Sequence, residues 1–435
     1  MQVKSGMVSN RSLKKVVKEL IDDVILEIRG IPDFLLIAFT SKYKRTDYKR
    51  ALELLTQETG VKNLIGGTFP AIGVQNEVPT TQGGAAFTFK GSEIKVQRPI
   101  IYKNIRTKKK KFITEFPKIY NTTKAKSKIA FILSTGPKLQ PNAMEQLKLL
   151  DSYPAIRYQK MFNVLGSGLE WLLGKQGLGT GSYIDELLNY LAINNVSELI
   201  GGATFDIDLE NNYQFVSDFI YSNSLVGTSF SSDTIKFGHS WAFDKSEKTK
   251  EYSITHKLKS GYIQKINGER ANNKLLQIMD VQSDIYNEFF EKFSYANALY
   301  LSGIKEEDGN YHPFMTANHP KLKGVVSTLP PSKITEDPIK AELFTQSGLG
   351  IEKSAYECVT KAAEKITNPK FGIFINCANR LLIAGDKIAE ENKKLAERLG
   401  DNVPFITLYS GCEFSIFSKK PKYTTVSIHG LVAGK

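Results

Sequence analysis

The chain has 435 residues, of which 41% are hydrophobic, and this composition excludes a disordered protein. The length exceeds the roughly 250–300 residues that one hydrophobic core usually serves, so we expect two or three domains. A formal net charge of +13 favours anionic partners. The longest apolar run, 34–39, is shorter than the about 20 residues of a membrane span, and three cysteines make no disulfide framework. We therefore expect a cytoplasmic protein without membrane insertion.

The first part of the chain has the pattern of parallel α/β structure. Apolar residues recur at helical spacing over 13–25, and the run "FLLIAF" that follows is typical of a buried strand. A helix is predicted over 45–59, with Gly60 as its C-terminal cap. The next short strand ends in the phrase "LIGG" at 64–67. Helices and strands that alternate with short loops predict a parallel sheet.

The same pattern returns further along, and the phrase "LIGG" returns with it at 199–202. The predicted elements are a strand at 127–135, helices at 142–150, 160–174 and 182–195, and a strand that ends at 202. An internal duplication explains the repeated order of elements. The alternative is that a glycine pair turns the chain after each of two unrelated strands.

A basic segment separates the two copies. Residues 103–128 are rich in lysine and predict either a solvated loop or a surface for anionic partners. Aromatic residues flank the charges at Tyr102, Phe112 and Tyr120, and such rings can stack on nucleic-acid bases. The candidate nucleic-acid-binding residues are Lys108, Lys109, Lys110, Lys111, Lys124, Lys126 and Lys128.

After residue 210 the pattern changes to short, alternating segments that predict antiparallel strands, followed by a strand, a turn at Gly268 and a helix. With this part, the order of motifs resembles the FIST sensory proteins, which combine a FIST N-terminal with a FIST C-terminal domain. The matching stretches are "ELIGGATFD", "FGHSWAF", "YSITHKLKSGYIQKINGERANNKLLQIM", "GIFINCANRLLIAG" and "PFITLYSGCEFSIF". The chain departs from the family in "SGCEF", where a Gly-Glu pair is usual, and at Asn379, where glycine is common.

The resemblance implies a FIST N-terminal-like domain with an internal repeat at 1–255 and a FIST C-terminal-like domain at 256–435. The fold class expected is mixed α/β and α+β: duplicated parallel β-α units, then a β-rich segment, then a C-terminal α/β domain. Two parallel strands joined by one helix should also place Cys377 and Cys412 at the same end of a sheet.

The family resemblance implies an intracellular sensory protein in signal transduction that binds a small ligand, an amino acid being one candidate, and signals through an unidentified protein. It implies no catalysis and no cofactor. Ligands of open parallel sheets bind at the carboxyl ends of strands, and Arg380 could hold a carboxylate with two hydrogen bonds. The candidate ligand-binding residues are Gly66, Gly67, Thr68, Gly201, Gly202, Ala203, Thr204, Asn376, Cys377, Arg380, Cys412 and Glu413.

Two alternatives come from other classes of protein. An RNA- or ribosome-associated protein would use the basic segment, and its binding would weaken steeply with salt. A thiol-dependent enzyme would use Cys412, Glu413, Cys377 and His429 as nucleophile, acid and base. The five histidines have no metal-ligand spacing, so no metal site is predicted.

Overall fold

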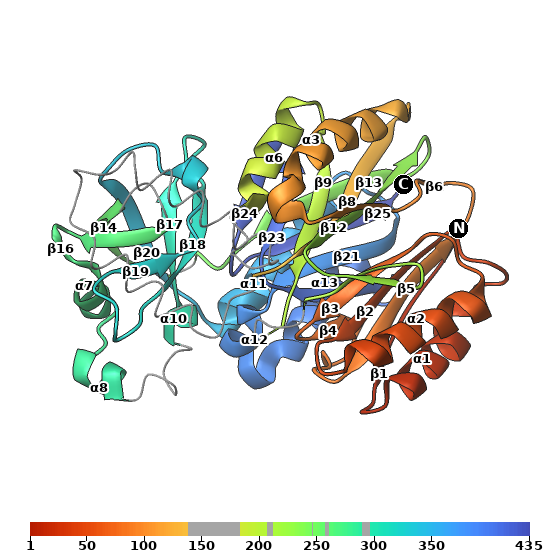
Figure 1. Cartoon of the computed structure of the whole chain (residues 1–435), viewed down its shortest axis with the longest axis horizontal. Coiled ribbons are helices and arrows are strands. Elements are labelled where there is room, and N and C mark those ends of the chain that lie inside the picture. Colours follow the sequence, from red (N-terminus) through yellow and green to blue (C-terminus); the bar gives the residue numbers. More distant parts are fainter. Residues whose placement is uncertain (138–182, 207–211, 246, 257–260, 289–295) are drawn as a thin grey trace.

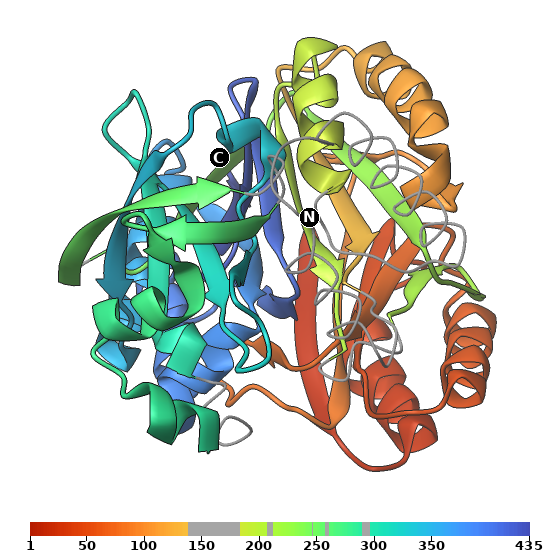
Figure 2. The ribbon, with the colours of Figure 1, turned by 60° about the vertical axis from the view of Figure 1, so that its left-hand side comes forward.

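The computed structural model describes residues 1–137, 183–206, 212–245, 247–256, 261–288 and 296–435 (Figure 1). It consists of a body of three mixed sheets backed by helices and, beside it, a smaller β-barrel (Figures 1 and 2). The predicted α/β class is confirmed. The helices predicted at 142–150 and 160–174 lie outside the described residues.

Each sheet of the body is built around one pair of parallel strands, with antiparallel neighbours on both sides. The first sheet has the order β1 (Gln2–Ser9), β5 (Gly83–Lys90), β2 (Phe34–Thr40), β3 (Leu64–Phe69), β10 (Gln214–Val216) and β11 (Phe219–Tyr221). The second has the order β24 (Lys420–Thr424), β23 (Glu413–Phe417), β9 (Leu199–Thr204), β8 (Ser127–Thr135), β12 (Ser224–Ser232) and β6 (Lys95–Val96), with β7 (Ile100–Lys103) also paired to β12. The third has the order β13 (Lys236–Ala242), β25 (Ile428–Gly434), β21 (Pro369–Cys377), β22 (Phe405–Ser410) and β4 (Ile72–Val74).

The parallel pairs are β2 with β3, β8 with β9, and β21 with β22. The two predicted copies are therefore present in separate sheets of matching topology, and the C-terminal segment adds a third sheet on the same plan. A short strand after the second member of each pair crosses to a neighbouring sheet: β4 pairs with β22, β10 with β3, and β23 with β9. These exchanges join the three sheets into one body.

One pair of helices covers the outer face of each sheet. The pairs are α1 (Leu13–Leu20) with α2 (Arg45–Thr59), α3 (Ile105–Thr122) with α6 (Tyr183–Ile193), and α11 (Gly348–Ala362) with α13 (Ile388–Leu399). A π-helical turn, η1 (Ile21–Ile25), continues α1, and α2 ends at Gly60 with φ of 64°, as predicted. The inner faces of all three sheets share one core, in which Leu36, Phe131 and Ile373 are completely buried.

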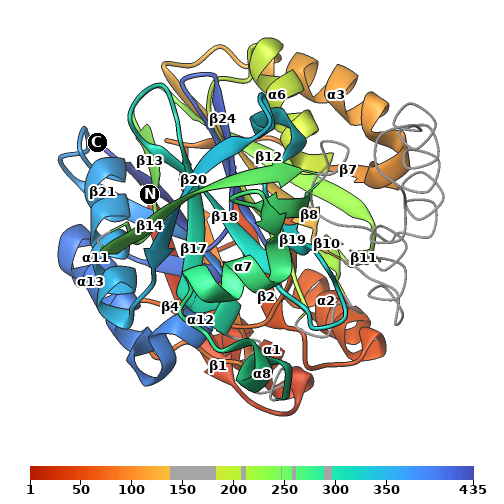
Figure 3. The same cartoon turned by 90° about the vertical axis from the view of Figure 1, so that its left-hand side faces the viewer.

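The smaller part is a closed antiparallel barrel. Its strands are β14 (Glu247–His256), β20 (Ile339–Thr345), β17 (Tyr300–Lys305), β18 (Tyr311–Ala317), β19 (Val325–Ser327) and β15 (Tyr262–Ile266), and β15 pairs again with β14. Strand β16 (Glu269–Arg270) and helices α7 (Ala271–Ile278), α8 (Ser283–Glu288) and α10 (Ala296–Leu299) accompany it (Figure 1). Figure 3 shows α7 and α8 beside the barrel strands. Gly268, with φ of 79°, occupies the predicted turn between β15 and α7. The antiparallel strands expected after residue 210 are confirmed.

The remaining short elements are η2 (Pro331–Lys333), α12 (Asn379–Ala384) and η3 (Gly385–Lys387). The boundary predicted at 255/256 falls inside β14, and strand pairs such as β13 with β25 join segments from both sides of it. Whether residues 1–255 and 256–435 are separate domains stays a prediction. No helix in the described part of the chain is long and apolar enough to cross a membrane.

The basic segment is not a loop, so this expectation was wrong. Residues 105–122 form α3, and Phe112, Phe116 and Tyr120 on one face are buried against the second sheet (Figure 1). A spacing of four residues places these rings on one side of a helix. Burial of three aromatic side chains offsets the repulsion between neighbouring lysines, which stay on the solvent side.

Candidate functional site

The two glycine pairs lie inside strands β3 and β9, not at the strand ends as predicted. Glycine is needed there because neighbouring main-chain or side-chain atoms approach these positions closely. A side chain at Gly66 would overlap the Ile37 carbonyl oxygen, and one at Gly201 would overlap the Ile132 carbonyl oxygen. A side chain at Gly67 would overlap Thr204. The repeated phrase therefore serves packing between strands at the centre of the body.

The threonines that follow the glycines are buried and use their hydroxyl groups within the protein. The Tyr213 backbone N–H donates to Thr68 Oγ1 at 3.0 Å, and the Gln214 amide donates to Thr204 Oγ1 at 2.6 Å. Ala203 is hydrogen-bonded to the last residue of β22, since its N–H donates to Ser410 Oγ at 2.9 Å. The first group of predicted ligand residues is thus close-packed.

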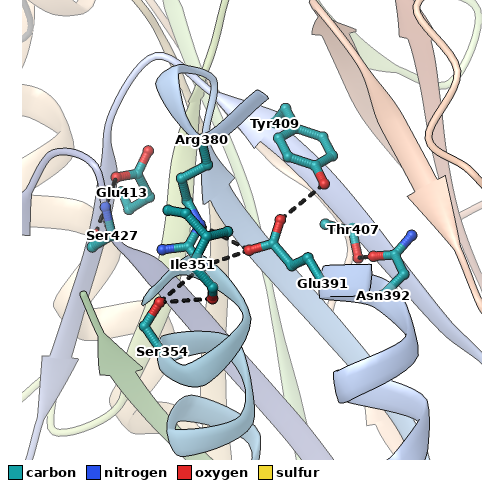
Figure 4. A network of polar contacts seen from close by, with 9 residues as sticks. All are labelled: Ile351, Ser354, Arg380, Glu391, Asn392, Thr407, Tyr409, Glu413 and Ser427. Atoms are coloured by element: carbon teal, nitrogen blue, oxygen red, sulfur yellow. Dashed lines mark hydrogen bonds and ion pairs between the residues drawn. The ribbon is translucent and has the colours of Figure 1, made fainter. Parts of the chain in front are cut away.

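The C-terminal group forms a polar network at the carboxyl ends of β21 and β22 (Figure 4). Arg380 lies in the first turn of α12 and is completely buried, contrary to a surface position. Its Nε and Nη2 donate to Glu391 Oε1 at 2.8 and 2.5 Å. Nη2 also donates to Ser354 Oγ at 3.1 Å, and the Tyr409 hydroxyl donates to Glu391 Oε2 at 3.0 Å.

Glu413 lies on the other side of Arg380 in Figure 4 and is also completely buried. Its Oε2 accepts a hydrogen bond from Ser427 Oγ at 3.1 Å. Burial raises the pKa of Glu413 well above its usual range, while Ser427 and Arg380 act against this shift. Burial therefore favours the protonated, uncharged form of this carboxyl group.

Arg380 Nη1 and Glu413 Oε1 have no hydrogen-bond partner among the described residues, and the same holds for both amide atoms of Asn376. Arg380 already has its charge balanced by Glu391, and burial favours the uncharged form of Glu413. Buried polar groups are nearly always bonded, so such atoms need an explanation. A small molecule that bonds to both groups would satisfy them.

The predicted site residues around this network lie together. Asn376 faces the Tyr409 hydroxyl, and the Cys377 thiol faces the Glu413 carboxyl. Glu413 is the strand partner of Gly202 across β23 and β9. Gly66, Gly67 and Thr68 belong instead to the first sheet, at the Thr204 side of the body.

Cys377 and Cys412 lie at the same end of the third sheet's parallel pair, as predicted, since Cys377 is the strand partner of Ser410. All three cysteines are buried free thiols. Burial raises the pKa of Cys358 to about 12, and burial together with Glu413 raises the pKa of Cys377 and Cys412 further. Thiols in such surroundings are poor nucleophiles.

The residues predicted to bind nucleic acid stay exposed only in part. Lys109 pairs with Glu186, and Lys111 with Glu115. Lys128 belongs to β8, where its Nζ lies 4.2 Å from the Tyr120 ring centre. Lys108, Lys110, Lys124 and Lys126 are exposed. The aromatic rings expected to stack on bases are buried, which contradicts that part of the hypothesis.

Sequence analysis missed Glu391, Tyr409, Ser354 and Ser427. A signal for Glu391 was present, because Glu391, Leu395 and Leu399 share one face of α13 and all three are buried. No described group of three or more His, Cys, Asp or Glu side chains is placed to hold a metal ion.

Comparison with known proteins adds the family. A search of curated proteins found no match. The family model of the FIST N domain, a sensory domain, matches residues 34–269, which is more than half of the chain. The FIST C-terminal domain stays a prediction. The matched segment includes both copies of the repeated unit and the first strands of the barrel. By this match, the chain belongs to the FIST family.

Proposed function

We propose that this protein is a sensor that binds a small zwitterionic ligand, such as an amino acid, between Arg380 and Glu413. The observation that carries the proposal is that Arg380 Nη1 and Glu413 Oε1 are buried without a hydrogen-bond partner in the described part of the chain. An α-carboxylate would accept a hydrogen bond from Arg380, and an α-ammonium group would donate to Glu413. The sensory character of the family supports this role.

The state of Glu413 gives the proposed site a property that can be measured. A ligand ammonium group beside a buried carboxyl favours the ionised form. Binding should therefore release a proton from Glu413. The ammonium and carboxylate groups together bring no net charge into the site, which suits a buried position where Arg380 is already neutralised by Glu391.

The experiment is a thermal-shift screen of the twenty amino acids with the wild type and a Glu413→Gln variant. Gln matches the protonated Glu in shape and can still accept from Ser427, so the variant should fold. A ligand at about 100 times its Kd should add about 2.7 kcal/mol to wild-type stability. Calorimetry in buffers of different ionisation enthalpy would detect the released proton.

The variant decides the outcome. Loss of the shift in Glu413→Gln, together with proton release in the wild type, supports the proposed site. An equal shift in both proteins would place the ligand elsewhere. Mass spectrometry of small molecules released from the denatured protein would detect ligands other than the twenty amino acids. The proposal requires such a ligand to carry a cationic group.

The proposal includes an output through a protein partner and gives the thiols no catalytic role. Strand β23 connects the proposed site with the protein surface. Glu413 points to the Arg380 network, whereas the next residue, Phe414, packs in the cluster beneath α3 and α6. A ligand that changes the position of β23 would therefore change the packing of these helices.

A further inference from the structure

The surface above that cluster carries a groove between α3 and α6. It encloses about 440 Å³. Its apolar wall consists of Ile113, Pro117 and Tyr190, and Lys118 and Asn194 contribute polar groups. Ile193, three residues after Tyr190 on α6, is 80% exposed and lies on the same side of the helix. The groove is thus a partly apolar surface without cover among the described residues.

The charges around the groove are mostly positive, although the exposed Glu186 of α6 pairs with Lys109. Residues 103–128 hold ten Lys and Arg and a single acidic residue, Glu115. Lys110, Thr114 and Lys118 follow each other at intervals of four and so lie on the groove side of α3. Both lysines are exposed. A ligand of this surface must combine apolar groups with negative charge.

We propose that the α3–α6 groove binds an acidic amphipathic helix of a partner protein. Helices bind grooves through apolar residues spaced three and four apart. Such residues would pack against Ile113, Pro117, Tyr190 and Ile193, while carboxylates on the helix flanks would face Lys110 and Lys118. Complementary charge would speed association and fix the orientation of the helix.

Two other occupants fit this surface less well. Single-stranded RNA needs several exposed aromatic rings, but Tyr102, Phe112 and Tyr120 are buried, which leaves only Tyr190 among the residues that line the groove. A second copy of this chain would bring a protein of formal charge +13 to a basic surface, and like charges in contact are repulsive. The acidic helix alone uses both the groove and the lysines.

The groove is separate from the proposed ligand site, so the two proposals fail independently. The test measures fluorescence anisotropy of a labelled synthetic helix with leucines on one face and glutamates on the other. One comparison probe has lysine in place of each glutamate, and another is a single-stranded RNA. We expect the acidic helix to bind, and to bind more weakly as salt is raised.

Two variants with exposed substitutions test the groove itself. Lys110→Glu with Lys118→Glu, and separately Ile193→Asp, should each weaken binding by about tenfold or more. The matched control is Lys14→Glu with Lys18→Glu on α1, which changes the net charge equally at exposed positions and should leave binding unchanged. Circular dichroism would verify that all variants are folded.

Three results would overturn the proposal. The first is absence of binding by the acidic helix. The second is equal binding by the groove variants and the α1 control. The third is RNA binding that exceeds helix binding and depends on Lys110 and Lys118, which would make this surface a nucleic-acid site instead.

Discussion

Arg380 and Glu391 form an ion pair in which neither side chain has any exposed surface, with 2.5 Å between Nη2 and Oε1. The pair joins α12 to α13. The Tyr409 hydroxyl donates to Glu391, and Ser354 Oγ accepts from Arg380 Nη2. A pair of this kind depends on both partners, because each charge alone would be strongly disfavoured in the protein interior.

Replacement of Glu391 by Ala should therefore destabilise the protein by about 3–5 kcal/mol, since it leaves the Arg380 charge buried and unpaired. Urea unfolding followed by circular dichroism would measure the loss. The double variant Arg380→Met with Glu391→Leu should lose much less, because no charge remains. A single variant as stable as the wild type would show that solvent reaches Arg380.

The glycine pairs give a second prediction. Gly66→Ala and Gly201→Ala should each cost about 1–3 kcal/mol or more, because the added methyl group meets a carbonyl oxygen of the neighbouring strand. Gly348→Ala at the start of α11 is the control, since its nearest neighbour would be at ordinary contact distance. Equal melting temperatures for all three variants would contradict the packing role.

Sequence patterns predicted the parallel units and the repeated phrase, because buried strands and amphipathic helices leave local signals. They also predicted the parallel strands that end at Cys377 and before Cys412. They did not reveal that this unit repeats the plan of the other two, since its strand "FITLYS" has no glycine pair to mark it. The buried state of Arg380 was equally hidden, because it depends on Glu391, eleven residues away, and on Ser354 in another helix. Such partners are set by tertiary packing.

The error over α3 has a different cause. The four lysines at 108–111 are typical of a solvated segment, although Phe112, Phe116 and Tyr120 have the spacing of a helix face. Phe112→Ala should cost about 3–5 kcal/mol because this ring is completely buried. Lys110→Ala, at an exposed position of the same helix, should change stability by less than about 0.5 kcal/mol. Thermal melts of both variants test the difference.

The raised pKa of Glu413 predicts that the contribution of this residue to the free energy of unfolding falls as pH rises. Its pKa is raised in the folded protein, so above the unfolded value of about 4.3 the folded state holds a proton that the unfolded state has lost. The stability that this proton contributes declines by up to about 1.4 kcal/mol per pH unit until the folded pKa is reached. The stability of Glu413→Gln relative to the wild type should therefore increase from about pH 4 to 7. A constant difference over this range would mean that Glu413 is ionised.

For His312, in the barrel, we expect the opposite pH dependence: its contribution to stability falls as pH falls. It lies on β18, is almost completely buried, and neither ring nitrogen has a hydrogen-bond partner among the described residues. Burial lowers the pKa of His312 to about 3, with Lys333 and Lys422 acting in the same direction and Glu306 against it. The folded protein therefore keeps this ring neutral, while the unfolded chain takes up a proton below about pH 6.5.

The stability contributed by neutral His312 is fully present above about pH 6.5 and is lost as pH falls toward the folded value, by up to about 1.4 kcal/mol per unit. His312→Gln removes this titration. The difference in urea midpoint between wild type and variant should therefore shrink, or change sign in favour of the variant, from neutral pH to about pH 4. His256, whose pKa burial lowers to about 4, adds the same dependence to both proteins and cancels in the comparison. Parallel stability curves would show that the His312 ring is protonated inside the barrel, with Glu306 as its partner.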